Sequence, residues 1–291
     1  MDFLYFIIDI YMEELMKKLY PLLLCVFLLS IVSCAEIQEG RINLNPEEKK
    51  SNYSSEITIS PMDFVTIKSD KIIIAPEKED ETYTISGYFN GQILCTTKNT
   101  IIKLNNAYLE NKSGLAALRC ESKAEVSLVK DSENYLVSSG RTYTRSAALQ
   151  GKRGLVIGGS GKLYVKGNLC HAFEAEDVKL KGTGTYYFQG TKKGSAISCE
   201  TFAVEKDKNF TAYILNSKNG IKADRTISIA SGNFYIYDNG TMMKTETKAD
   251  SEKHAHFITL SGGTFHTAGN RVDFVTESGA LNYKDAKIIE E

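Results

Sequence analysis

The segment Gly194–Asp224, with the sequence GSAISCETFAVEKDKNFTAYILNSKNGIKAD, contains one short pattern twice. Each copy is a small residue, an apolar residue, any residue, a small residue and an acid, as in Ala196-Ile197-Ser198-Cys199-Glu200 and Gly220-Ile221-Lys222-Ala223-Asp224. Further copies begin at Ala117 and Ala172, and looser ones at positions 148, 242 and 273. The apolar members fall at 118, 149, 173, 197, 221, 243 and 274, so their spacings are 31, 24, 24, 24, 22 and 31 residues. A nearly fixed period of this length indicates a repeat architecture. The two spacings of 31 residues predict longer excursions from the repeat, one at Asp131–Ser146 and one at 244–257 or just after it.

Stretches between these copies alternate apolar and polar residues around a glycine-containing turn. Examples are LVIGGSGKLYV from Leu155 and VKLKGTGTYYF from Val178. This alternation predicts short strands with one apolar side. Three such strands in each repeat of ~24 residues predict an all-β fold, a parallel β-helix of about seven coils, with equivalent residues stacked ~4.8 Å apart. A β-propeller needs ~40 residues per repeat, and a β-sandwich has no reason to keep this register.

The composition agrees with a folded all-β protein. The chain has 291 residues with 22 Gly, 4 Pro, no Trp, 16 Tyr and 13 Phe, which favours strands and tight turns over helices. Hydrophobic residues at 42% and charged residues at 24% are globular values. The formal net charge of -1 gives no electrostatic attraction for nucleic acid, so no nucleic-acid partner is expected.

The N-terminal residues 1–34 have the order of a secretory signal. A basic start at Met16-Lys17-Lys18 precedes an apolar run from Leu19 to Ser30, and Ile31-Val32-Ser33-Cys34 follows. The apolar run is shorter than the ~20 residues that a membrane-spanning helix needs. The order predicts an export signal, with Met16 as the true start of translation.

The end of this signal resembles a bacterial lipobox. The resemblance implies that Cys34 carries lipid and anchors the chain to a bacterial membrane, in an extracytoplasmic location for which the outer membrane or cell surface is favoured. An ordinary signal peptide with an unrelated cysteine is the alternative. Residues 35–56 are polar and lack periodicity, which predicts a flexible tether, and residues 57–291 are predicted to form the folded domain.

The acids that end the short pattern predict a row of carboxylates along the repeat. Like charges at this spacing repel unless a cation lies among them, and Ca²⁺ takes six to eight oxygen ligands. The alternative is a row of solvated turn acids that Lys152, Lys222, Arg225 and Lys244 neutralise. Under the first interpretation, the candidate calcium ligands are Glu176, Asp177, Glu200 and Asp224.

Aromatic residues form a second candidate site. Alignment of the strands that follow the glycine turns places Leu163, Tyr186, Phe234 and Phe265 inward. Exposed rings stack well on sugar rings, although an aromatic ladder that rigidifies the sheet is an equal alternative. The candidate carbohydrate-binding residues are Tyr164, Tyr187 and Tyr235 in one outward column with His266, and Tyr213 and Tyr237 in a further outward column.

Catalytic and disulfide signals are weak. The chain lacks the G-x-S-x-G, H-E-x-x-H and P-loop patterns, and its four histidines are scattered. Cys120 and Cys199 occupy one repeat position three coils apart, ~14 Å by the strand spacing, which is too far for a disulfide. A link between Cys95 and Cys120 stays open. No catalytic residue is assigned.

Several coils resemble a known family. RGLVIGGSGKLYVKG from Arg153, KGTGTYYFQGTKKGSAISCE from Lys181 and SKNGIKADRTISIASGNFYIYDNG from Ser217 are similar to bacterial carbohydrate-binding-domain lipoproteins, a polysaccharide-lyase-like family. The resemblance covers roughly residues 72–274. It implies a right-handed parallel β-helix, bound calcium and binding of cell-wall or acidic polysaccharides. The chain departs from the family pattern at Leu169–Phe173, where glycines and an isoleucine are usual.

Together these features predict a monomeric, lipid-anchored protein that binds polysaccharide without catalysis. Calcium is expected to assist by bridging protein carboxylates to those of uronic acids. A calcium-dependent polysaccharide lyase, with Glu200, Asp224 and Lys222 as a candidate set, is the first alternative. A structural surface lipoprotein or adhesin without affinity for glycans is the second.

Overall fold

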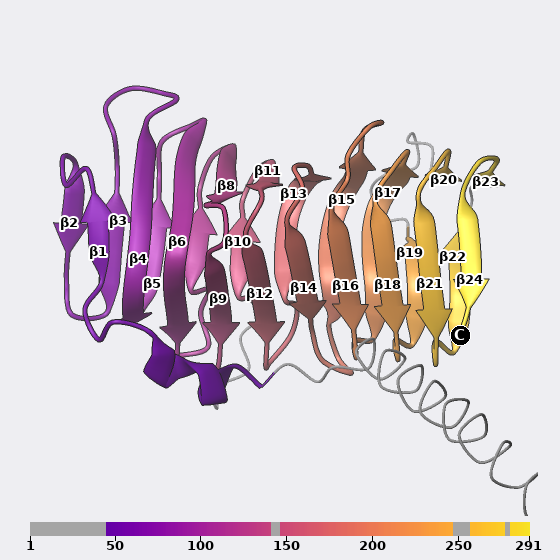
Figure 1. Ribbon diagram of the computed structural model, residues 1–291, viewed down its shortest axis with the longest axis horizontal. Coiled ribbons are helices and arrows are strands. Elements are labelled where there is room, and N and C mark those ends of the chain that lie inside the picture. Colours follow the sequence, from indigo (N-terminus) through magenta and orange to yellow (C-terminus); the bar gives the residue numbers. More distant parts are fainter. Residues whose placement is uncertain (1–44, 141–145, 247–256, 277–279) are drawn as a thin grey trace, which may run out of the picture. The chain divides into compact units, whose positions relative to one another are not determined.

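The computed structural model describes residues 45–140, 146–246, 257–276 and 280–291 (Figure 1). They form 24 strands and one 3-10 helix, η1 (Pro46–Asn52), which confirms the predicted all-β fold. Two strand pairs near the N-terminus are antiparallel, and the other pairs are parallel. Each parallel strand pairs with its equivalent in the next repeat, so the strands form three columns along the molecule.

The first strand column contains the short pattern found in the sequence. Its residues Phe173, Ile197 and Ile221 are directly paired across neighbouring strands, and each side chain is 0% exposed. The predicted interior row is therefore confirmed. The strands of the first column are β3 (Lys71–Ile74), β5 (Gln92–Cys95), β7 (Leu118–Cys120), β10 (Leu149–Gly151), the first halves of β13 (Phe173–Leu180), β15 (Ser195–Val204) and β17 (Asn219–Ile229), then β19 (Thr241–Thr245) and β22 (Val272–Thr276).

The second strand column follows the first along the chain. Its predicted apolar side is buried, as Val178, Phe202 and Ile227 show in consecutive strands. The strands of the second column are the first halves of β4 (Thr82–Asn90) and β6 (Thr100–Asn111), then β8 (Ala124–Leu128), β11 (Leu155–Gly159), the second halves of β13, β15 and β17, β20 (Phe257–Leu260) and β23 (Leu281–Tyr283).

The third strand column completes each repeat. Leu163, Tyr186, Phe234 and Phe265 are 0% exposed, so their predicted inward direction is confirmed. The strands of the third column are the second halves of β4 and β6, then β9 (Glu133–Ser138), β12 (Lys162–Gly167), β14 (Thr185–Gln189), β16 (Thr211–Leu215), β18 (Asn233–Tyr237), β21 (Thr264–Ala268) and β24 (Lys287–Glu290).

One continuous apolar core runs between the three columns. No single repeat has enough apolar area to bury its own inward side chains, so each repeat gains its core from the neighbours on either side. This explains why the inward positions are apolar in one repeat after another. It also explains why the period of the apolar residues could be read from the sequence.

The N-terminal end of the columns is covered by antiparallel strands. β1 (Thr58–Ser60) pairs with β4, and β2 (Val65–Ile67) pairs with β3. Gly87 makes the pairing of β1 with β4 possible. Its φ of 81° suits glycine, and its missing side chain leaves room for the backbone of Glu56. These pairings satisfy the strand edges that would otherwise be open at this end.

Two predictions about the irregular segments are wrong. Residues 46–53, assigned to the flexible tether, contain η1 and pack on the third column. The excursion predicted between Asp131 and Ser146 contains strand β9, whose alternation was hidden by its charged and polar neighbours. The other excursion, at 244–257, lies largely outside the described residues.

Four cysteines in the described part of the chain are buried, and no disulfide joins them to one another: Cys95, Cys120, Cys170 and Cys199. Cys120 and Cys199 share one row but are separated by two intervening strands, as predicted. Cys95 and Cys120 are direct neighbours in register. No helix in the described residues has the length and apolar character needed to cross a membrane.

Candidate functional site

A groove of about 890 Å³ lies over the outward side of the first strand column. Outward and inward side chains alternate along each strand, so the outward residues of successive strands form a row. Gln150, Glu174, Ser198 and Lys222 are such a row, each paired with the next, and they form the floor of the groove. The groove therefore extends along several repeats rather than across one.

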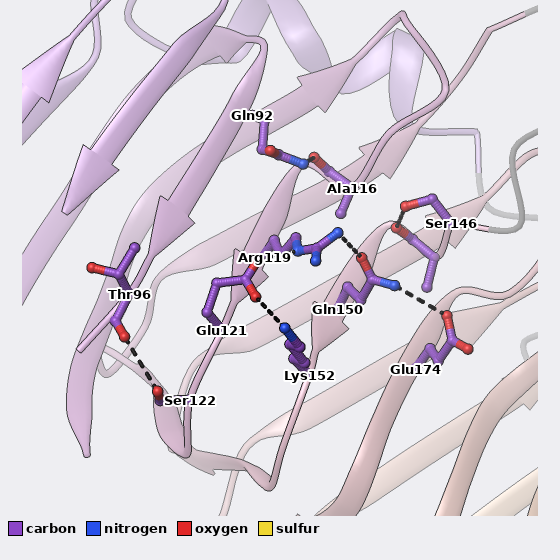
Figure 2. Close-up of polar contacts among 11 residues, drawn as sticks. Gln92, Thr96, Ala116, Arg119, Glu121, Ser122, Ser146, Gln150, Lys152 and Glu174 are labelled. Atoms are coloured by element: carbon purple, nitrogen blue, oxygen red, sulfur yellow. Dashed lines mark hydrogen bonds and ion pairs between the residues drawn. The ribbon is translucent and has the colours of Figure 1, made fainter. Parts of the chain in front are cut away.

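Polar side chains on the floor are connected from strand to strand. Figure 2 shows Arg119 Nη1 donating to Gln150 Oε1 at 3.3 Å, and Gln150 Nε2 donating to Glu174 Oε2 at 3.4 Å. In the same view Lys152 Nζ lies 3.5 Å from Glu121 Oε2. The floor thus continues towards the N-terminus as a row of amide, guanidinium and carboxylate groups.

The wall of the groove at the bend after the first column contains the predicted row of acids. The three acids of this row that line the groove are each paired with a base: Glu176 with Arg153 at 3.3 Å, Glu200 with Arg225 at 3.2 Å, and Asp224 with Lys222 at 3.8 Å.

The same pairing continues outside the groove. Glu121 pairs with Arg119, and Glu246 with Lys222 and Lys244. Burial opposes ionisation of Glu246, but hydrogen bonds from the two lysines outweigh it and lower the pKa of that carboxyl. The described acids of the row fit the interpretation of acids neutralised by neighbouring bases, while Glu277 lies outside the described residues.

The four predicted calcium ligands are not brought together. Glu176, Glu200 and Asp224 line the long groove, whereas Asp177 lines a separate groove of about 350 Å³ and accepts a hydrogen bond from Thr201 Oγ1 at 2.6 Å. The alternation of β13 is interrupted at this bend, where Glu176 and Asp177 are both partly exposed between the buried Ala175 and Val178, and the two acids line different grooves. In the part of the chain that is described, no three His, Cys, Asp or Glu side chains converge as metal ligands. This arrangement does not fit a calcium ion.

The opposite wall of the groove consists of turns that precede the first column. Lys193 and Lys218 are exposed there, and neither has an ion-pair partner among the described residues. His171 lines the same wall. Unpaired ammonium groups beside a polar floor form a site that attracts an anionic, hydrogen-bonding ligand.

The tyrosines of the third column form a continuous ladder. From Tyr164 through Tyr187, Tyr213 and Tyr235 to His266, neighbouring ring centroids are 4.4 to 4.8 Å apart with interplanar angles of 5 to 16°. Each inner ring therefore has both faces covered by its neighbours. The alternative of an aromatic ladder that rigidifies the sheet agrees with this geometry, whereas sugar stacking on the faces of Tyr164, Tyr187 and Tyr235 does not.

Two of the predicted aromatic positions are wrong. Tyr213 belongs to the same ladder as Tyr187 and Tyr235, because it pairs with both. Tyr237 is 2% exposed, and its hydroxyl donates to Glu291 Oε2 at 2.6 Å, so its ring is not available to a ligand. Tyr237 is the last residue of β18, where the alternation ends and two consecutive residues are buried.

The N-terminal rungs of the ladder were missed in the sequence. Tyr88, Tyr108 and Tyr135 pair in register and continue the ladder, but the segment around η1 covers them. Lys50 Nζ lies 4.4 Å from the ring centroid of Tyr88 and 3.0 Å from Glu110 Oε2. The period-2 alternation around these tyrosines was a usable signal, because each precedes an apolar residue in a strand-like stretch.

The architecture and groove define a class: an all-β protein of stacked parallel strands with a polar groove along its repeats. The chain belongs to the family of carbohydrate-binding domain-containing proteins, whose model matches residues 68–177 and again residues 171–288. The two consecutive matches agree with the internal repetition.

Among solved structures, the chain is similar to a polysaccharide lyase-like protein from C. thermocellum, determined as a gadolinium derivative. The TM-score is 0.52 and the sequence identity 17%, over 81% of this chain and 94% of the other. At this identity the likeness shows the fold alone. A search of curated proteins found no match.

Proposed function

We propose that the protein binds an acidic polysaccharide noncovalently in the groove over the first strand column. The observation that carries this proposal is the polar floor, which repeats its hydrogen-bonding groups along several strands beside Lys193 and Lys218, for which the described residues supply no ion-pair partner. A polymer with repeating units suits a site with repeating groups. Ammonium groups bind carboxylates or sulfates, and amide and carboxyl groups bind sugar hydroxyls. Membership of a carbohydrate-binding family supports the ligand class.

We also propose that the three strand columns are the three faces of a right-handed parallel β-helix. Support comes from the parallel register of all three columns and from the strong preference of parallel crossover connections for the right hand. A crystal structure with a left-handed coil would contradict this.

The binding proposal is tested by calorimetric titration with oligogalacturonate and with a neutral glucan of the same length. We expect binding of the charged oligomer, weakened by added salt because ammonium–carboxylate attraction is screened. The double substitution Lys193→Ala and Lys218→Ala should weaken binding about tenfold or more. Lys98→Ala is the matched control, because Lys98 is exposed and paired with Glu79 away from the groove. Equal affinity of the double variant and the control would reject this groove.

A lyase is not favoured by the contacts of the candidate base. Lys222 Nζ lies 3.1 Å from Glu246 Oε2 and 3.8 Å from Asp224 Oδ1, so two carboxylates hold it. A lyase would release unsaturated sugar products that absorb ultraviolet light. Appearance of that absorbance on incubation with uronans would restore this function, whereas a glycan array without any binding would favour the structural adhesin.

The lipid anchor is a separate proposal that rests on the sequence around Cys34, which lies outside the described residues. We propose that Cys34 is acylated after removal of residues 1–33 and holds the protein at a bacterial membrane. Metabolic labelling with a fatty-acid analogue tests it, with Cys34→Ala as the variant that should lose both the label and the membrane fraction.

A further inference from the structure

His171 is held rigidly at the wall of the groove. It lies in the turn between β12 and β13, where the backbone of the next repeat passes close by. A side chain on Gly167 would clash with the His171 carbonyl, and one on Gly194 with the backbone of Cys170 and His171. Close packing of two repeats therefore fixes the backbone of the turn that carries His171.

A hydrogen-bond chain fixes the protonation pattern of the ring. The backbone N–H of Ser195 donates to His171 Nδ1 at 2.9 Å, and Ser195 Oγ accepts from Asn219 Nδ2 at 3.1 Å. Nδ1 is thus an acceptor, so the proton of the neutral ring is on Nε2. Burial, together with the charge of Lys222, lowers the pKa of His171 to about 4, so the ring is neutral at pH 7.

We propose that His171 determines glycan specificity in this groove, because its Nε2–H donates a hydrogen bond to an oxygen acceptor of the bound sugar. The inference rests on the proposed binding function. The neighbouring lysines of the groove supply charge with little directional demand, whereas the imidazole supplies one donor in a fixed direction. A fixed donor discriminates between sugars by where they place an acceptor oxygen.

The decisive comparison is between His171→Asn and His171→Gln. Asparagine places an acceptor near the Nδ1 position and keeps the contact with the Ser195 N–H, but it lacks a donor at the Nε2 position. Glutamine reaches the Nε2 position with an amide donor and loses the Nδ1 acceptor. We expect His171→Asn to weaken oligogalacturonate binding about tenfold with little change in melting temperature. We expect His171→Gln to stay within about threefold of the wild type in affinity and to melt earlier.

A purely structural histidine gives the opposite order, with binding kept in His171→Asn, and that result would overturn the inference. Nitrogen-15 NMR of the free protein gives a readout that needs no ligand. A proton on Nδ1 would overturn the inference by itself, and the expected proton on Nε2 supports it.

The binding proposal can fail separately. If the wild type binds no acidic oligomer, both the proposed function and the role of His171 are rejected. If the wild type binds and the Lys193 and Lys218 double variant loses affinity while His171→Asn does not, only the role of His171 is rejected.

Discussion

Tyr164 and Tyr187 stack with their ring centroids 4.4 Å apart and their planes within 7°, on neighbouring strands in exact parallel register. The distance follows from the spacing of paired strands, so the same contact recurs wherever consecutive repeats carry an aromatic residue at this position. The ladder consequently acts along the whole third column as a brace for the stacked repeats.

Removal of one rung should destabilise the protein. Tyr187→Ala deletes the stacks with Tyr164 and Tyr213, each worth about 0.5–1.5 kcal/mol beyond burial, so a total loss of about 2–4 kcal/mol is expected with the burial included. Tyr187→Phe keeps the ring and should lose less than about 1.5 kcal/mol. Urea denaturation measures both. Equal losses would mean that the hydroxyl, and not the stack, matters.

A large cavity in the interior row of the first column should destabilise the protein. Ile197 is 0% exposed between Phe173 and Ile221, so Ile197→Ala is expected to cost about 2–5 kcal/mol. Ser198→Ala on the outward side of the same strand should change stability by about 0.5 kcal/mol or less. Chemical denaturation, analysed with the same m value for both variants, compares their free energies of unfolding. A similar cost for both substitutions would contradict the assignment of inward and outward sides.

Glu110 should make stability depend on acid pH. Its side chain is 1% exposed; burial opposes ionisation, but hydrogen bonds from Lys50 and Ser139 and the charge of Lys112 lower its pKa below the ordinary 4.5. Because the folded-state pKa is the lower one, this contribution is complete above about pH 4.5 and is lost as the pH falls through the folded-state value.

Thermal melts from pH 7 to pH 3 test this. On acidification, the melting temperature of the Glu110→Gln variant should fall less than that of the wild type. Parallel curves for the two proteins would assign the acid sensitivity to other carboxyls.

Calcium should change neither stability nor glycan affinity. Glu176 and Glu200 are each paired with arginine, and Asp177 lies in another groove, so the four acids offer no common site. Any ion that binds the folded state raises the melting temperature by mass action. Melts and titrations with calcium, and then with a chelator, check this. A calcium-dependent rise that Asp224→Asn abolishes would show that the acids rearrange around the ion.

Parts of the fold were predictable because stacking imposes the same demand on every repeat. The apolar residue of the short pattern must fill the shared core, so Phe173, Ile197 and Ile221 revealed their row through spacing alone. Strand alternation gave the inward rings of Tyr186 and Phe234 in the same way. Segments without a strong apolar period, such as β9 and η1, were missed because their positions depend on contacts with distant tyrosines and with Glu110.

The candidate site was less predictable than the fold. The sequence indicated that acids recur once per repeat, but it could not indicate where each carboxylate points at the bend. The divergence of Glu176 from Asp177, and the pairing of Glu200 with Arg225, depend on local backbone direction and on side-chain reach. The same holds for His171, whose role requires the Ser195 N–H of the next repeat.

Residue order was sufficient to predict the period, the strand type and the inward rows, because burial of apolar side chains must be repeated in each unit of a stacked fold. The folded arrangement was needed to show which charges neutralise one another, which ring faces are covered and where a groove stays open. Those outcomes depend on distances of a few ångströms between side chains of neighbouring repeats, and such distances follow from the packed backbone and not from residue order.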